Sequence, residues 1–186
     1  MTIVYVFENT LYLNITNRCT NSCDFCVRTI SDGYYSENSL WLEYEPSLDE
    51  ILTALEKYKF DDYKEIVFCG YGEPTCRLNI MLQVCRFIRK KSGIKIRLNT
   101  NGHASLIEHH DTAPLFEGLL DTVSVSLNAA DAESYQNICH SKFGKSAFYG
   151  MLDFAREVKK YVPEVLFSVV RTTIPESDVE KCKKIA

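Results

Sequence analysis

The sequence predicts an α/β protein whose parallel strands form a partial (β/α)6-type, TIM-like barrel that is laterally open. Short runs rich in β-branched and aromatic residues alternate along the chain with longer amphipathic runs. Strands that are separated by helices need crossover connections, which give a parallel sheet with helices outside it. The chain offers five strand candidates in 186 residues, whereas a closed eight-stranded barrel takes about 250 residues. The sheet is therefore expected to stay open.

Five strands and four helices are expected along the chain. The first helix begins at a capping box, Ser47-Leu48-Asp49-Glu50, the second ends before Gly93, and Pro175 opens the last. The strand candidates are residues 11–16, 65–69, 94–100, 122–128 and 165–170, and the second and third helices cover residues 77–93 and 145–161. A sixth barrel strand is expected after the last helix, but the sequence stops at Ala186, so the last strand is expected to be missing.

Polar and apolar residues alternate along the third and fourth strand candidates. Successive side chains of a strand point to opposite faces, so each of these strands has one apolar and one polar face. The apolar face fits against helices and the polar face fits the lining of a site; a polar face that is merely solvated is the alternative. The polar side chains are Lys95, Arg97, Asn99 and Asn101 in one strand and Thr122, Ser124, Ser126 and Asn128 in the other.

The whole chain, residues 1–186, is expected to form one domain, because it contains no low-complexity tract, linker or repeat. The net charge of -4 gives no electrostatic footprint for nucleic acid or for an acidic membrane surface. The sequence shows no signal peptide and no membrane-spanning run, which indicates a cytoplasmic protein. Thiols stay reduced in that compartment, so the eight cysteines are expected to be metal ligands, reactive thiols or core residues.

Polar and glycine-containing segments follow the strand candidates, at the end where parallel α/β folds bind ligands. The stretch "FCGYGEPT", residues 68–75, follows the second strand, and "NTNG", residues 99–102, closes the third. Gly70 and Gly72 would let a ligand approach the backbone, and Glu73 offers a carboxylate. These segments are expected to surround one site together with the segment after the first strand.

The segment after the first strand, "NITNRCTNSCDFCVR" at residues 14–28, holds three cysteines within eight residues. Three residues separate Cys19 from Cys23, and two separate Cys23 from Cys26. Cysteine thiolates hold iron–sulfur clusters, and a [4Fe–4S] cluster has four irons. Three ligands would leave one iron open to a ligand from outside the protein, so this cysteine loop predicts a cluster of that kind.

A buried helical face and a zinc site are the two alternatives for the three cysteines. On a helix their spacing would place them on one buried face, but "RCTNSCDFC" is rich in poor helix formers. A zinc site would need a fourth thiolate, from Cys69 or Cys76, yet zinc ribbons use two C-x2-C motifs and no such pair exists here. The remaining cysteines, Cys85, Cys139 and Cys182, are expected to pack as ordinary core residues.

These motifs resemble the signature of the radical S-adenosylmethionine (SAM) superfamily, which is C-x3-C-x2-C with an aromatic residue, here Phe25, before the third cysteine. "GYGEP", residues 70–74, is similar to the family's glycine–glutamate motif after the second strand. More closely, the chain resembles the small radical SAM proteins linked to TatD-type DNases. The residues that carry this likeness are "LYLNITNRCTNSCDFCVR", "LWLEYEPS" and "IVFCGYGEPT", at residues 11–28, 40–47 and 66–75, and the likeness extends through the fifth strand.

The resemblance implies a cofactor pair, a [4Fe–4S] cluster held by Cys19, Cys23 and Cys26, and SAM on the open iron. It also implies a set of SAM contacts from the rim segments. Glu73, with the backbone of its neighbours, would hold the methionyl ammonium group, and Phe25 matches the loop position that contacts adenine. The other implied contacts are the backbone of Gly70, Tyr71 and Gly72, the ribose or carboxylate partners Ser126 and Asn128, and the polar wall residues Asn99 and Asn101.

The function implied by the resemblance is a radical SAM enzyme, in which reductive cleavage of SAM gives a 5′-deoxyadenosyl radical that abstracts hydrogen from a substrate. A flavodoxin- or ferredoxin-type electron donor is implied as a partner. The substrate stays open: a short, open barrel would admit a macromolecule from the side, and His103 at the rim is placed to reach a substrate. The alternative function is an iron–sulfur or zinc-binding scaffold or electron carrier without SAM chemistry, which would need no carboxylate at Glu73.

An aromatic-rich insertion, residues 31–46, separates the cysteine loop from the first helix. It contains Tyr34, Tyr35, Trp41 and Tyr44. Two arrangements are equally consistent with this composition: a lid that closes over the site and excludes water, or a hydrophobic plug at the edge of the barrel.

Overall fold

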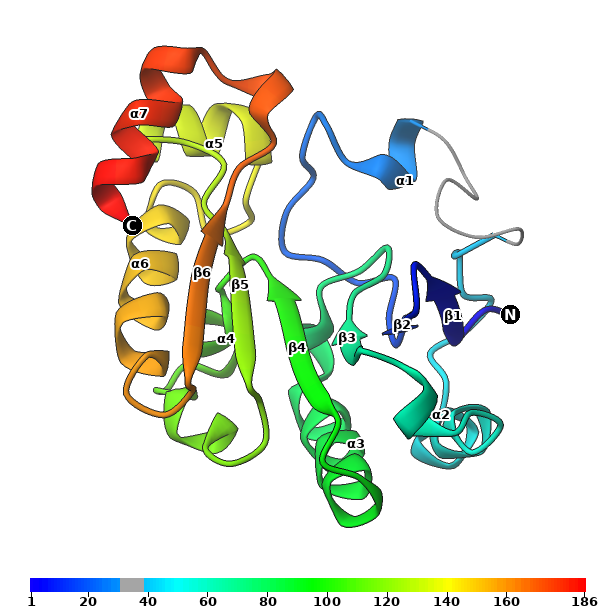
Figure 1. Cartoon of the computed structure of the whole chain (residues 1–186). Coiled ribbons are helices and arrows are strands. Elements are labelled where there is room, and N and C mark those ends of the chain that lie inside the picture. The colour runs from blue at the N-terminus through cyan, green and yellow to red at the C-terminus, as the bar shows by residue number, and fades with distance from the viewer. Residues whose placement is uncertain (31–38) are drawn as a thin grey trace.

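The computed structural model describes residues 1–30 and 39–186, and it shows a six-stranded sheet with helices on its outer side (Figure 1). The strands follow one another across the sheet in sequence order. Five of them are parallel, and the first pairs antiparallel with the second. The strands are β1 (Val4–Phe7), β2 (Thr10–Leu13), β3 (Glu65–Phe68), β4 (Lys95–Thr100), β5 (Thr122–Ser126) and β6 (Glu164–Ser168).

The helices connect successive parallel strands and cover the sheet from outside, with α3, α4 and α6 lying along β4, β5 and β6 (Figure 1). A 3-10 turn, η2 (Pro74–Arg77), leads into α3. The helices are α1 (Val27–Ile30), α2 (Leu48–Leu55), α3 (Leu78–Lys91), α4 (Ala104–Glu108), α5 (Ala132–Cys139), α6 (Ser146–Val158) and α7 (Glu176–Ile185). None of the helices in the described ranges is long and apolar enough to cross a membrane.

The predicted fold class is confirmed, because β1 and β6 form the two edges of an open sheet instead of closing a barrel. The five strand candidates are the five parallel strands. The sheet also contains β1, which the sequence reasoning missed. It joins β2 through Glu8 and Asn9, whose φ angles are 45° and 63°. Positive φ at both positions matches a type I′ hairpin turn, but Glu at the first position gives no signal for such a turn.

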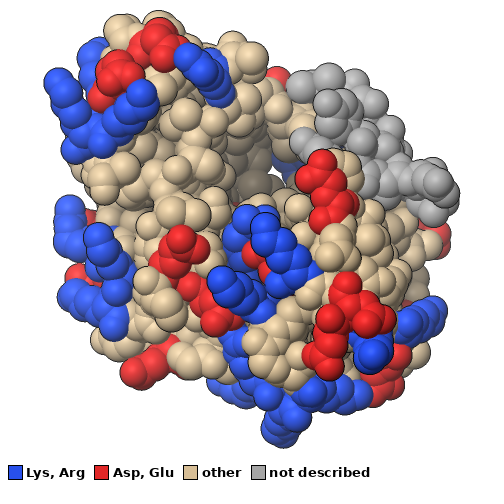
Figure 2. Space-filling model, viewed as in Figure 1, with Lys and Arg blue, Asp and Glu red and all other residues tan. Residues whose placement is uncertain are grey.

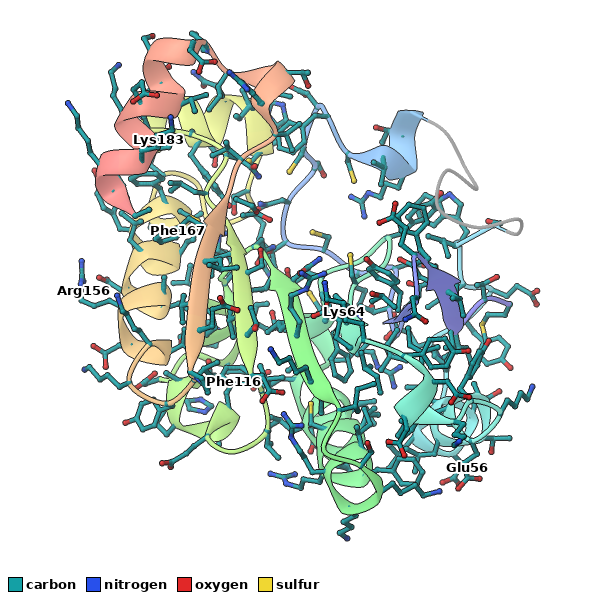
Figure 3. The ribbon with its side chains drawn as sticks, viewed as in Figure 1. Glu56, Lys64, Phe116, Arg156, Phe167 and Lys183 are labelled. Carbon is teal, nitrogen blue, oxygen red and sulfur yellow. The ribbon has the colours of Figure 1, made fainter. Side chains whose placement is uncertain are left out.

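The alternating pattern of the strands separates an apolar outer face from a polar inner face, as predicted. Ile66, Ile96 and Val123 are fully buried on the outer face against the helices. Arg97 lies on the inner face of β4, where its guanidinium is 3.4 Å from the Glu65 carboxylate of β3. Phe116, near the bottom of the view in Figure 3, lies in the outer core and meets Phe154 edge-on at a centroid distance of 5.9 Å.

The capping box predicted at the start of α2 is confirmed. The hydroxyl of Ser47 accepts a hydrogen bond from the Glu50 amide at 3.2 Å, and the Glu50 carboxylate accepts one from the Ser47 amide at 2.8 Å. Two amides at the helix N-terminus, which have no partner within the helix, are thereby satisfied.

We expect Ser47→Ala to lower the free energy of unfolding by about 1 kcal/mol, because the Glu50 amide loses its acceptor. Urea unfolding followed by circular dichroism measures the change. Thr53→Ala, at an exposed position in the same helix, is the matched control and is expected to leave stability unchanged or slightly higher. Equal stability of Ser47→Ala and wild type would contradict the role of the cap.

Candidate functional site

A cavity of about 430 Å³ lies beside the cysteine loop, at the carboxyl ends of the parallel strands. The view of this side of the molecule shows a hollow surrounded mostly by uncharged residues (Figure 2). The cavity brings together four of the predicted site residues, Phe25, Cys26, Asn99 and Ser126. Its other lining residues are Tyr5, Phe7, Tyr12, Val27, Cys69 and Val170. Two larger hollows of about 520 Å³ each are lined by residues outside the cysteine loop and the strand ends around it.

The cysteine loop runs from the end of β2 to α1 and carries its three thiols in different environments. Cys26 turns back so that its amide donates to the Cys23 carbonyl at 3.1 Å. Cys19 is exposed as a residue, but its sulfur accepts a hydrogen bond from the Asn21 amide at 3.4 Å. Protein atoms packed around this sulfur desolvate it and raise the pKa of the Cys19 thiol to about 12. Ligation of a metal there would have to displace the thiol proton.

The middle of the cysteine loop lies along the C-terminal end of α5. The Ser22 amide donates to the Cys139 carbonyl at 2.9 Å, and the Asp24 amide donates to the Ile138 carbonyl at 3.1 Å. A side-chain contact joins Asp24 and His140, with 2.8 Å between Oδ1 and Nε2. The main-chain contacts fix the loop without depending on the identity of the α5 side chains.

This docking brings Cys139 next to one of the predicted cluster ligands. Cys139 is fully buried, as expected for a core residue, but it also lies against Cys23, and a hydrogen bond between the two thiols lowers the pKa of Cys23. No pattern in the sequence signals this contact, because the two cysteines are far apart in the chain and belong to no common motif.

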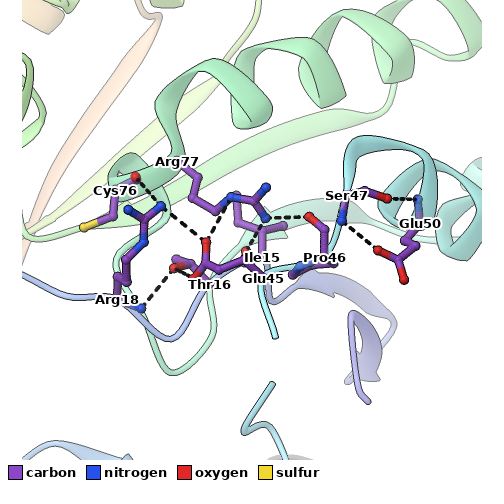
Figure 4. A network of polar contacts seen from close by, with 9 residues as sticks. All are labelled: Ile15, Thr16, Arg18, Glu45, Pro46, Ser47, Glu50, Cys76 and Arg77. Atoms are coloured by element: carbon purple, nitrogen blue, oxygen red, sulfur yellow. Dashed lines mark hydrogen bonds and ion pairs between the residues drawn. The ribbon is translucent and has the colours of Figure 1, made fainter. Parts of the chain in front are cut away.

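The rest of the cysteine loop is anchored at its base by Arg77 and Glu45 (Figure 4). Arg77 donates to the carbonyl of Ile15 at 3.0 Å and to that of Pro46 at 2.6 Å, and its Nε lies 3.1 Å from the Glu45 carboxylate. The same carboxylate accepts the Thr16 hydroxyl at 2.6 Å. Three chain segments therefore meet at one ion pair directly before the first cysteine.

Glu73 is buried, with 4% of its surface exposed, and its carboxylate accepts four hydrogen bonds. Oε1 accepts the amide and hydroxyl of Thr75 at 3.0 and 2.7 Å and the hydroxyl of Thr100 at 2.8 Å. Oε2 accepts the amide of Asn101 at 2.7 Å. Burial raises the pKa of Glu73, and the four donors oppose that rise. Glu73 thus ties the ends of β3 and β4 together, and within the described chain Oε2 is the oxygen with acceptor capacity left.

Gly70 and Gly72 allow the turn after β3 to lie close against the base of the cysteine loop. A Cβ on Gly70 would lie 2.2 Å from Oδ1 of Asn14, and one on Gly72 would lie 2.3 Å from the carbonyl oxygen of Thr16. The Glu73 amide, next in the chain, donates to the Arg18 carbonyl at 2.7 Å. The sequence reasoning expected these glycines to admit a ligand; the structure gives them a different task, contact with the base of the cysteine loop. Approach by a ligand stays a prediction.

Two other predicted contacts have their side chains away from the cavity lining. Asn128 has a left-handed backbone with φ 55°, and its Oδ1 accepts the Val170 amide at 3.3 Å. Tyr71 is buried in a cluster with Tyr5 and Leu40. The Asn128 side chain also hydrogen-bonds Cys139, which lies against Cys23, so a contact of Asn128 with SAM stays a prediction.

Asn99 lines the cavity and carries a buried polar atom without a partner among the described residues. Its amide side chain hydrogen-bonds Cys69, whose pKa is raised by burial, and its Oδ1 is buried without a hydrogen-bond partner in the part of the chain that the structure describes. A buried polar atom without a partner costs stability unless a ligand or water satisfies it. This acceptor therefore fits a polar ligand in the cavity.

The described half of the insertion buries its leucines and exposes its aromatic residues Trp41 and Tyr44, so neither the lid nor the plug is confirmed. Leu40 and Leu42 are buried, and the Asn17 side chain both donates to and accepts from the Leu42 backbone, at 2.7 and 3.1 Å. Trp41 is 42% exposed and meets Tyr71 edge-on at 5.2 Å. Of the aromatic residues expected to form a lid or plug, Tyr34 and Tyr35 lie outside the described residues.

Three thiols lie on one short loop, and iron–sulfur clusters are held by thiolates. In the described ranges, no three His, Cys, Asp or Glu side chains are already gathered in an arrangement that could hold a metal ion, and this applies to Cys19, Cys23 and Cys26 as well as to a set with Cys69 or Cys76. The loop would close around a cluster as it binds, and the cavity next to Cys26 would remain for an external ligand.

The chain belongs to the radical SAM superfamily, whose family model matches residues 13–185. Members of this family use a [4Fe–4S] cluster and SAM, so the cofactors expected from the sequence are those of the family. The comparisons identify the superfamily; the likeness to the TatD-linked proteins stays a prediction.

The relatives by sequence include enzymes of different kinds. The chain is 29% identical over 165 residues to the tungsten-containing aldehyde ferredoxin oxidoreductase cofactor-modifying protein of Pyrococcus furiosus, in a match that covers 87% of this chain and 43% of that protein. It is 26% identical over 155 residues to GTP 3′,8-cyclase of Staphylococcus haemolyticus, with 82% and 43% covered. The chain therefore spans less than half the length of these curated relatives.

Solved structures share the fold at low sequence identity. A radical SAM methyltransferase from Sphaerobacter thermophilus matches with a TM-score of 0.66 and 14% identity, over 98% of this chain and 54% of that one. TYW1 with a lysine-pyruvate adduct bound matches with a TM-score of 0.61 and 18% identity, over 95% and 60%. These likenesses support the partial barrel and carry no information on the substrate.

We expect Gly72→Ala to destabilise the protein by about 1–3 kcal/mol, because the added methyl group would meet backbone atoms that cannot move aside without shifting the cysteine loop. Chemical unfolding of the metal-free protein measures this. Gly93→Ala is the control: a Cβ there meets nothing within 4 Å, so stability should change by less than about 1 kcal/mol. Tolerance of alanine at Gly72 would show that the close approach does not constrain this turn.

We expect Glu73→Gln to cost about 2 kcal/mol of stability even without cofactors, because one of its four donors then faces an amide NH2 group instead of an oxygen. Glu56→Gln removes an exposed carboxylate that pairs with Lys91, and it should cost no more than about 0.5 kcal/mol. Thermal and urea unfolding of both variants separate the two cases; equal small losses would mean that the Glu73 carboxylate does not hold the strand ends together.

Proposed function

We propose that the chain is the core of a radical SAM enzyme in which Cys19, Cys23 and Cys26 hold a [4Fe–4S] cluster and SAM occupies the adjoining cavity. The observation that carries the proposal is the shared lining of that cavity by a predicted ligand, Cys26, and by Asn99 and Ser126 from two neighbouring strands. Family membership supports the identity of the cofactors, and the local geometry supports the position proposed for them.

The cofactors, when bound and reduced, supply a 5′-deoxyadenosyl radical that abstracts hydrogen from a substrate. The chain's own residues bind and orient. Phe25 offers the cavity an aromatic face and a loop backbone for adenine, while Ser126 and the unpaired Oδ1 of Asn99 offer hydrogen bonds to polar groups. Glu73 and residues 70–72 lie outside the cavity lining, and the remaining acceptor capacity of Glu73 Oε2 is the candidate for the methionyl ammonium.

The partners of the reaction are inferred at the level of class. An electron donor of the flavodoxin or ferredoxin type, in the cytoplasm, would reduce the cluster. The edges β1 and β6 leave the barrel open, so a large substrate, including a macromolecule, could reach the cavity from the side. The relatives named above act on different substrates, and their specificity is not transferred to this chain.

The second candidate function is a metal-binding scaffold or electron carrier without SAM chemistry. An electron carrier needs no polar cavity beside its cluster, whereas this cavity carries a buried acceptor that finds no partner in the described residues. Cys139 lies in close contact with Cys23. This contact favours the second candidate only if Cys139 becomes the fourth ligand of the cluster, because no iron would then be open to SAM.

The deciding experiment is anaerobic reconstitution with iron and sulfide, followed by reduction in the presence of SAM. We expect about four irons per chain, a cluster spectrum that changes when SAM is added, and formation of 5′-deoxyadenosine. Cys26→Ala should abolish 5′-deoxyadenosine formation, whereas Cys182→Ala, at a buried position in α7 away from the cavity, should retain it.

Three outcomes would overturn this proposal. A colourless protein with one zinc per chain would exclude both iron-based functions, and loss of that zinc in Cys76→Ala would identify a four-thiolate site. A complete cluster that does not respond to SAM would leave only the carrier. Retention of SAM cleavage in Cys26→Ala would show that the ligand assignment is wrong.

A further inference from the structure

A buried polar network lies directly beneath the cysteine loop and contains five side chains from three parts of the chain. Thr20 and Asn21 belong to the loop, Asn101 and His103 follow β4, and Tyr135 comes from α5. Each of them is at most 8% exposed. Burial of so many polar groups is costly unless they satisfy one another, and here they form a continuous series of hydrogen bonds, although Asn21 Oδ1 has no partner among the described residues.

His103 is the centre of the network. Its Nδ1 lies 2.9 Å from the hydroxyl of Thr20, and its Nε2 lies 3.3 Å from the hydroxyl of Tyr135. Burial lowers the pKa of His103 to about 4, so the ring is neutral near pH 7 and carries a single N–H. A neutral imidazole donates on one side and accepts on the other, which suits a position between two hydroxyl groups.

The structure corrects the expectation that His103 lies within reach of a substrate. The side chain is fully buried and is not part of the cavity lining. It packs edge-on against Phe143 at 5.7 Å, on the side of the cysteine loop that faces the protein interior. A role in direct contact with substrate is therefore excluded by its position in this structure.

The network ends at the sulfur of Cys19. Asn101 Nδ2 donates to the Thr20 hydroxyl at 2.8 Å and lies 3.9 Å from Cys19 Sγ. The backbone amide of Asn21 donates to the same sulfur at 3.4 Å. The Asn21 side chain donates through Nδ2 to the Tyr135 hydroxyl at 3.0 Å. Both N–H donors that point at Cys19 thus belong to residues fixed by the network.

We propose that His103 and Tyr135 are positioning residues for the cluster: through Thr20, Asn21 and Asn101 they hold two N–H donors against Cys19 Sγ and thereby set the reduction potential. This inference rests on the proposed function, since it requires a cluster on Cys19. Hydrogen bonds to cluster sulfurs stabilise the reduced state, which carries more negative charge, and so raise the potential. Loss of the network should make the cluster harder to reduce.

The test uses the full chain, reconstituted anaerobically, and measures the cluster potential by a redox titration followed by electron paramagnetic resonance without SAM. We expect Tyr135→Phe, which keeps the ring and removes the hydroxyl, to shift the potential to a more negative value. His103→Leu, which removes both ring nitrogens, should shift it further in the same direction. His103→Asn, which restores a polar group near Nδ1, should recover part of the shift.

Two control variants separate positioning from general destabilisation. Tyr63→Phe removes a hydroxyl far from the cysteine loop, and Ser47→Ala weakens the fold at α2; neither should change the potential. If His103→Leu fails to fold, Thr20→Val tests the same hydrogen bonds with a side chain of similar shape. Unchanged potentials in Tyr135→Phe and Thr20→Val, with full cluster content, would overturn the inference.

The outcome is separable from that of the proposed function. If the wild-type chain takes up no cluster, the proposed function fails and no potential exists to be compared. If wild type binds a cluster and cleaves SAM while the variants keep the same potential, the proposed function stands and only the positioning role is lost.

Discussion

The buried carboxylate of Glu73 is the interaction that the rest of the site depends on. It joins the turn after β3 to the end of β4 through Thr75, Thr100 and the Asn101 amide. Moving a charged carboxylate from water into the protein interior costs free energy, and only the complete set of donors offsets that cost. Because the Asn101 backbone is fixed in this way, its side chain is held at the base of the cysteine loop, where it meets Thr20.

The cysteine loop itself belongs to no strand, so it depends on neighbours on every side. Arg77 and Glu45 hold its base, the glycines of residues 70–72 accept its backbone, and α5 holds its middle. The thiols are thus placed by contacts with four separate parts of the chain. Such a loop can adjust around a cluster with little effect on the sheet, because its described hydrogen bonds lie outside the strand ladder apart from that of the Asn14 amide to the Ile3 carbonyl, which continues the β1–β2 pairing.

Regular patterns made much of the fold and part of the site predictable. The alternation along β4 and β5 depends only on the two-residue period of a strand, and it correctly put Asn99 and Ser126 on the cavity side. The spacing of the three cysteines and the Ser47 capping box are local signals of the same kind. The left-handed backbone of Asn128 is not marked by any such local signal in the sequence.

Contacts between segments that are far apart in the chain could not be predicted from the sequence. His103 and Tyr135 meet the cysteine loop only because α5 lies next to the segment that follows β4, and the same packing brings Cys139 to Cys23. Each residue taken alone is an ordinary core side chain. β1 was missed for a different reason: four residues and a Glu-Asn turn fall below the length and turn signals on which strand prediction relies.

The docking of the cysteine loop on α5 has a consequence for how this region can vary. The helix offers main-chain carbonyls at Ile138 and Cys139, so exchange of its exposed side chains leaves the docking intact. The docking does depend on the number of residues in α5. One inserted residue would rotate those carbonyls by about 100° around the helix axis, since a turn takes 3.6 residues. Changes of side chain would be tolerated here, whereas a single-codon insertion or deletion would shift the cysteine loop out of register with its support.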